Sequence, residues 1–111
     1  MWYQKKVELP GEVIYEIVTA EDTLSFGIVM VLLTKSRPHF HTHIREKYVL
    51  IGGSLIVHID DECVMLTRPM DEVDIPINMT HWAESLNPGT PAQILLITTP
   101  AWTKEDHHTV S

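Results

Sequence analysis

The chain has 111 residues, of which 44% are apolar and 21% charged, and a formal net charge of −7. This length suits one domain with a hydrophobic core, and the composition excludes intrinsic disorder. The acidic balance disfavours phosphate backbones and anionic membrane surfaces, so we expect neither nucleic acid nor a membrane as partner. Cys63 is the only cysteine, and the N-terminus lacks the apolar run of a signal peptide. Both features favour a cytoplasmic protein without disulfides.

Stretches rich in Val, Ile and aromatic residues, bounded by turn residues, predict strands along most of the chain. One of them, 27–33, is apolar at both odd and even positions, as in a strand that is covered on both faces. The spacing of the stretches, about ten residues, is typical of a small all-β sandwich or barrel. The expected strands cover residues 12–18, 26–33, 47–51, 54–60, 64–66, 73–77, 81–86 and 93–98.

We expect a single domain over residues 1–111, with a barrel over about 12–99 and a C-terminal arm over 100–111. The arm either begins a short helical turn, with Thr103 as candidate N-cap, or lies along the barrel. His107 and His108 belong to this arm and are interpreted as part of a mobile tail.

The most informative stretch is centred on His39, His41 and His43, which recur at every second position and are followed by Glu46. An extended backbone places alternate side chains on one side. Imidazoles and one carboxylate suit borderline divalent metals and leave open coordination positions for chemistry. A further ligand must come from elsewhere in the chain, and His81, which follows a turn, is the best candidate.

These residues resemble two motifs of the cupin superfamily. The first motif has two histidines, a glutamate and a glycine at spacings that match this chain throughout, at His39, His41, Glu46 and Gly53. The second is degenerate: Pro76 and His81 match, whereas Asn78 replaces a glycine and Ser85 an asparagine. Asn78 is a mild departure because Asn tolerates a left-handed backbone. Two further glycines are replaced by Leu33 and Met70.

The resemblance implies an antiparallel double-stranded β-helix, or jelly-roll barrel, with one divalent transition metal ion inside. Fe, Mn, Ni, Zn, Co and Cu are not distinguished by these residues. The implied ligands are His39, His41, Glu46 and His81. A shifted register, with His41 and His43 as the motif pair, leaves little chain for the corner before Glu46. We therefore expect His43 at the mouth of the site or on the surface.

Three further side chains have open assignments. Tyr48 shares the parity of Glu46, so its hydroxyl either contacts a ligand or serves the core. Ser85 shares the parity of His81 and is a candidate for the pocket. His58 is expected on the outer face, and Cys63 lacks a setting for nucleophilic catalysis.

Two functions follow from this interpretation. The first is a metal-dependent enzyme acting on a small oxygenated metabolite, with dioxygenase, isomerase or cyclase-like chemistry. The second is a non-catalytic module that binds a sugar or another small molecule. In either case, the two-sided apolar strand at 27–33 and the outward parity of Ile56 and Trp82 predict a homodimer.

Overall fold

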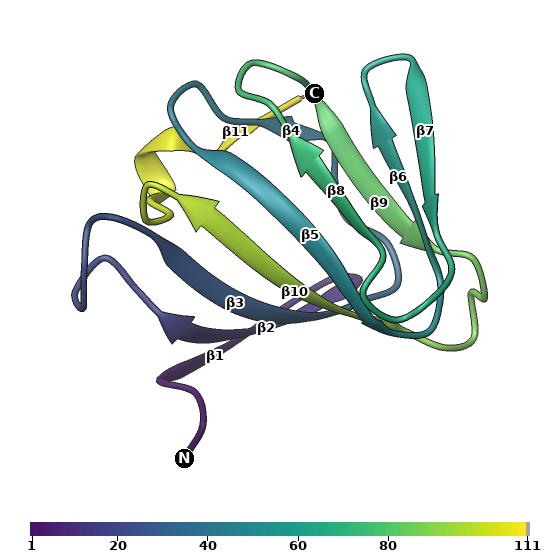
Figure 1. Cartoon of the computed structure of the whole chain (residues 1–111), viewed down its shortest axis with the longest axis horizontal. Coiled ribbons are helices and arrows are strands. Elements are labelled where there is room, and N and C mark those ends of the chain that lie inside the picture. Colours follow the sequence, from purple (N-terminus) through teal and green to yellow (C-terminus); the bar gives the residue numbers. More distant parts are fainter. Residues whose placement is uncertain (111) are drawn as a thin grey trace.

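The computed structural model describes residues 1–110, which form two β-sheets facing each other (Figure 1). One sheet has six strands in the order β1-β2-β3-β10-β5-β8, and the other has five in the order β11-β4-β9-β6-β7. All strand pairs between these residues are antiparallel, which confirms the predicted all-β jelly-roll barrel. No helix in residues 1–110 is long and apolar enough to cross a membrane.

The elements in chain order are β1 (Lys5–Leu9), β2 (Glu12–Val18), β3 (Gly27–Leu33), β4 (His39–Phe40), β5 (Arg45–Gly52), β6 (Leu55–Ile59), β7 (Glu62–Leu66), β8 (Glu72–Ile75), β9 (His81–Ser85), β10 (Ala92–Thr99), the 3₁₀ turn η1 (Lys104–Asp106) and β11 (His108–Thr109).

The barrel interior is apolar along most of its length and polar at one end. The inner face of β5 shows the change, because Glu46 at its start gives way to Tyr48 and Leu50 further along. On β9 the inner face likewise begins with His81 and continues with Ala83. The apolar part gives the barrel its rigidity, and the polar end forms the candidate site. The buried core cluster consists of Val31, Leu33, Tyr48, Leu50, Leu55, Val57, Leu66, Ile75, Ala83, Ala92 and Ile94.

Eight strands lie close to their predicted ranges; β1 and β11 were missed, and β4 is a shorter form of the extended segment expected at the histidines. β1 contains only two apolar residues, Val7 and the exposed Leu9, and is an edge strand defined by its pairing with β2. β4 ends at Phe40, so His41 lies just beyond the strand that was expected to carry it. The arm combines both predicted alternatives, since it makes a 3₁₀ turn and then adds β11 beside β4. Thr103 takes the N-cap position but makes no side-chain capping bond.

Two residues at usual glycine positions of the resembled motifs have left-handed backbone conformations. Asn78 has φ 64°, as expected for an Asn that replaces a glycine. Its N–H donates to the carbonyl of His41 at 2.6 Å and so ties the second motif to the first. Met70 has φ 75°, which is costly for a side chain with a Cβ. Leu33, by contrast, is a regular residue of β3 and part of the core.

Replacing Met70 with glycine is expected to raise the free energy of unfolding by about 0.5–1 kcal/mol, the left-handed penalty less the entropy cost of glycine. Little packing is lost because the Met70 side chain is 70% exposed. Leu33→Gly is the matched control and should destabilise by at least about 2 kcal/mol, since it empties a core position. Urea denaturation measures the stability of both variants. A Met70→Gly protein less stable than the parent would contradict the prediction that the left-handed backbone at Met70 is strained.

Candidate metal centre

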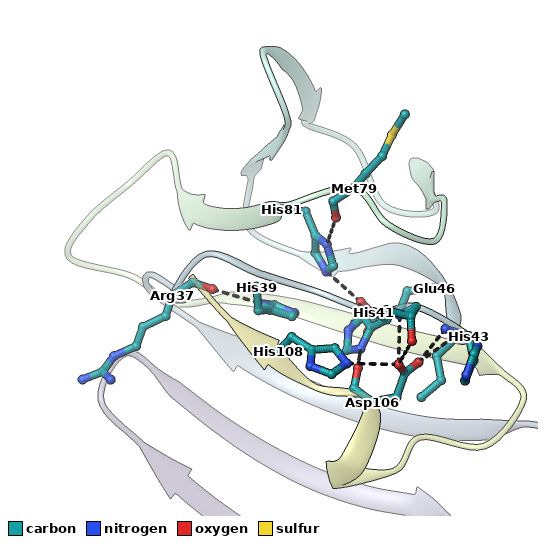
Figure 2. Close-up of polar contacts among 11 residues, drawn as sticks. Arg37, His39, His41, His43, Glu46, Met79, His81, Asp106 and His108 are labelled. Carbon is teal, nitrogen blue, oxygen red and sulfur yellow. Dashed lines mark hydrogen bonds and ion pairs between the residues drawn. The ribbon is translucent and has the colours of Figure 1, made fainter. Parts of the chain in front are cut away.

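The four predicted ligands come from separate parts of the barrel and meet at its polar end (Figure 2). His39 lies on β4 directly opposite His81 on β9, because the two strands pair at this position. His41 follows β4 in the turn that leads into β5, and Glu46 is the second residue of β5. The corner predicted between the histidine pair and Glu46 is therefore present.

One ligand atom from each residue lies within 4.8 Å of all the others. Glu46 Oε1 is 2.7 Å from His81 Nε2 and 3.0 Å from His41 Nε2. Ligands bound at about 2.1 Å and at right angles lie about 3 Å apart, so these separations suit one shared ion. Glu46, His41 and His81 are at most 4% exposed, and His39 is partly buried.

Backbone carbonyls determine which nitrogen of each imidazole faces the site. His39 Nδ1 lies 2.8 Å from the carbonyl oxygen of Arg37, and His81 Nδ1 lies 3.1 Å from that of Met79. His41 Nδ1 lies 2.8 Å from the carbonyl oxygen of Asp106. A carbonyl only accepts, so each Nδ1 carries the proton and each neutral ring keeps its lone pair on Nε2. This arrangement of outer hydrogen bonds is typical of metal-binding histidines.

The contacts at Glu46 require a positive charge among them. Two imidazole lone pairs and a carboxylate oxygen at these separations repel one another unless a proton or a metal ion lies between them. His41 Nε2 is fully buried and makes no hydrogen bond of normal geometry. The residues therefore fit a divalent cation, which would satisfy this orphaned nitrogen.

The electrostatics favour an ionised Glu46 and a neutral His39, whereas His41 gains proton affinity in the metal-free site. Burial opposes ionisation of Glu46, but its contacts with His41 and His81 hold its pKa well below the usual range. Burial and the neighbouring His81 lower the pKa of His39 to about 4. Burial also acts to lower the pKa of His41, but Glu46 and Asp106 outweigh it and raise this pKa above the ordinary value.

Asp106 holds the ligand-bearing turn in place, a role that the sequence did not indicate. Its carboxylate accepts the backbone N–H groups of Thr42, His43 and Ile44 at 2.8–2.9 Å and the Thr42 hydroxyl at 2.6 Å. Burial opposes ionisation of Asp106, yet these donors hold its pKa well below the usual range. The only sequence signal was an acidic pair in the arm, which is common on surfaces.

The arm also brings His107 to the centre. Its ring centroid lies 4.5 Å from that of His39 and 5.5 Å from that of His41. The interpretation of this histidine as part of a mobile tail is therefore wrong. The error has a physical reason: β11 pairs with β4 and fixes the arm across the site, a contact that no local pattern predicts.

The three candidates for the pocket occupy different surroundings. Tyr48 is buried inside the barrel, with its ring centroid 6.2 Å from that of His81. Burial and the charges of Glu46 and Glu12 raise the pKa of its hydroxyl well above 10. The His43 side chain is exposed, and the turn bound by Asp106 presents only its backbone N–H inward. The cluster thus contains the His39–His41 pair and does not include His43.

Ser85 lies at the far end of β9 from His81, where its hydroxyl is 2.7 Å from the carbonyl of Thr90 and accepts the N–H of Asn87 at 3.2 Å. The hydroxyl therefore closes the turn before β10, which does not support the pocket role expected for it. Ser85 and His81 do share one face of β9, but the length of the strand separates the two residues.

His58 lies on the outer face, as predicted. Its ring stacks on that of Trp82 with centroids 3.8 Å apart, and Cys63 Sγ lies 3.3 Å from His58 Nδ1. Trp82 has the parity opposite His81, so these residues face away from the candidate centre.

Fold and site together define a small antiparallel barrel with a buried cluster of three histidines and one glutamate that could hold a metal ion. No family model matches the sequence. No curated protein matches it either. Solved structures do match, and those given below have cupin folds. The chain therefore has the fold of a cupin barrel.

A uridine-bound structure of a Pac13 variant from Streptomyces is 16% identical, with a TM-score of 0.83, and the match covers 96% of this chain and 84% of that one. Pac13 is described as a nucleoside dehydratase. KdgF from Halomonas sp. is 18% identical, with a TM-score of 0.78, and the match covers 92% of this chain and 91% of that one. A formate complex of oxalate decarboxylase from Lactobacillus farciminis is 13% identical, with a TM-score of 0.80. That match covers 96% of this chain and 33% of the other, so this chain spans about a third of that enzyme.

Proposed function

We propose that this protein is a metal-dependent enzyme that binds one divalent transition metal ion and acts on a small oxygenated metabolite. The ion would be held by His39, His41, Glu46 and His81. The observation that carries the proposal is the common orientation of the three imidazoles, each with Nδ1 bonded to a carbonyl and Nε2 directed at the cluster.

Such an ion supplies Lewis acidity that polarises a bound carbonyl or hydroxyl group. Four protein ligands leave positions open on a metal that prefers five or six. Glu46 contributes a single negative charge, so a site loaded with a divalent ion keeps positive charge and favours an anionic or enolic oxygen donor. The surrounding barrel excludes water from the ligands, since His41 and His81 are at most 2% exposed.

The chemistry of the structural neighbours supports a small polar substrate without selecting a reaction. Pac13 is seen with uridine, and oxalate decarboxylase with formate. Dioxygenase, isomerase and cyclase-like reactions all remain within the proposal, because fold similarity alone does not define a reaction. A panel of sugars, diols and hydroxy acids, assayed for oxygen uptake and product formation, tests catalysis. Absence of turnover with a metal-loaded protein would favour the non-catalytic binding module.

Metal release on acidification gives an independent test of histidine ligation. Protons compete with the ion for the imidazole nitrogens, so affinity should fall as pH drops below roughly 6. His41, whose pKa is raised in the metal-free protein, takes up a proton first. Below about pH 4 His39 is protonated as well, and the loss should steepen. Metal content after dialysis at stepped pH measures this, and full retention at pH 4 would contradict the site.

We also propose that the outer face of the six-stranded sheet associates with a second copy of the chain. One row across this face pairs Tyr15 with Met30 and Met30 with Leu95, and all three side chains are partly exposed. A sheet face this apolar is typical of an interface between subunits. Sedimentation at micromolar concentration should show a dimer, and Leu95→Lys should shift it to monomer. A parent protein that sediments only as a monomer would contradict this proposal.

A further inference from the structure

Residues 108–110 of the arm are built into the barrel on the side where the candidate centre lies. β11 pairs with β4, with His108 opposite Phe40 and Thr109 opposite His39. Figure 1 shows this arm, in yellow, crossing beside β4. The N–H of Val110 also donates to the carbonyl of Pro38 at 3.1 Å. These backbone bonds hold His107, which lies between η1 and β11, at a defined position.

His107 lies beside the four predicted ligands without joining them. Its ring is nearly parallel to that of His39, with an interplanar angle of 25° and a centroid distance of 4.5 Å. A ligating nitrogen directs its lone pair in the plane of its ring, so two stacked rings do not direct their lone pairs at one ion. The group whose ligand atoms converge accordingly contains His39 and omits His107.

His107 also carries an unsatisfied polar atom. Its Nδ1 is buried and has no hydrogen-bond partner among the described residues. A buried donor or acceptor without a partner costs about 1–3 kcal/mol, and such atoms are rare in folded proteins. A bound molecule that supplies the missing partner recovers this cost, and the ring that carries this nitrogen lies against the rings of His39 and His41.

We propose that His107 binds the small molecule taken up at the metal centre, through a hydrogen bond between its Nδ1 and an oxygen of that molecule. This inference rests on the proposed function and names a substrate class for the same site, the 2-hydroxycarboxylates. Their hydroxyl group donates and their carboxylate accepts, so they satisfy Nδ1 in either tautomer. Their negative charge complements a divalent ion balanced by Glu46 alone.

The test uses the full-length protein, Co(II) as the ion and glycolate as the probe. The visible absorption of bound Co(II) reports first on metal uptake and then on glycolate binding. His107→Phe keeps the ring stacked on His39 and removes both nitrogens. Its Co(II) affinity and spectrum should match those of the parent within about threefold, whereas glycolate should bind about tenfold more weakly, as for one lost hydrogen bond.

Two further variants make the result specific. His107→Asn retains a polar atom on Cγ, where Nδ1 is attached in histidine, and should recover part of the lost glycolate affinity. His43→Phe changes an exposed histidine of the ligand-bearing turn and should leave glycolate binding unchanged. Equal glycolate affinity in the parent and His107→Phe proteins, or no glycolate binding by the Co(II)-loaded parent, would overturn the proposal.

A changed Co(II) spectrum with a large loss of metal affinity in His107→Phe would also overturn it, because His107 would then be a ligand. Failure of the parent to bind Co(II) refutes the proposed metal site itself, and this inference with it. The two failures are distinguished because the Co(II) titration precedes the addition of glycolate.

Discussion

His81→Ala is expected to abolish stable metal binding. The metal content should fall well below the one ion per chain expected of the parent, and the metal affinity should fall by at least about a hundredfold. Loss of an outer hydrogen-bond partner alone costs 10–100-fold, so loss of a ligand should exceed this range. His81 Nε2 is 2.7 Å from Glu46 Oε1, so its removal also leaves the buried carboxylate with one partner fewer. Elemental analysis of protein purified without a histidine tag measures the effect.

Glu46→Gln offers a second route to the same result, because it keeps the side-chain shape and removes the only carboxylate of the cluster. Tyr48→Phe is the matched control, since Tyr48 is buried nearby but contributes no ligand atom. It should retain the metal of the parent protein. Metal-free parent protein, or undiminished metal in His81→Ala, would contradict the proposed centre.

Asp106→Ala is expected to lower the free energy of unfolding by about 3–5 kcal/mol, because it leaves buried backbone donors of the ligand-bearing turn without an acceptor. The carboxylate accepts four hydrogen bonds there, from Thr42, His43 and Ile44. A less ordered turn presents His41 poorly, so metal affinity should also fall about 10–100-fold. Chemical denaturation and metal titration measure the two effects on one sample.

The neighbouring Glu105 provides the control, because it is exposed. Glu105→Ala should change stability by no more than about 0.5 kcal/mol. Asp106→Asn keeps one acceptor oxygen and should fall between Asp106→Ala and the parent in both measurements. Equal metal affinity in the Asp106→Ala and parent proteins would show that the turn keeps its conformation without this carboxylate.

The sequence was sufficient to predict the barrel and the clustering of the four candidate ligands because both depend on short-range patterns. Runs of β-branched residues between turn residues predicted eight of the strands, and the regular spacing from His39 to Glu46 marked the first half of the site. The left-handed backbone at Asn78 was also predictable, since it follows from the residue type. His81 was within reach because a turn precedes it and its parity defines a face of β9.

Pairings distant in the chain were decided by the tertiary structure alone. Asp106 meets the turn at Thr42 across more than sixty residues, and in this turn His43 is exposed while His41 joins the cluster. The same arm carries His107 to the centre, although nothing in its local sequence distinguishes it from a loose tail.

Sharing a face of a strand was also not enough to predict proximity to the site. Ser85 shares the face of His81 but lies at the other end of β9. Residue type and spacing thus determined which donor groups this site contains. Its enclosure and orientation were determined by backbone hydrogen bonds between segments that only the folded chain brings together.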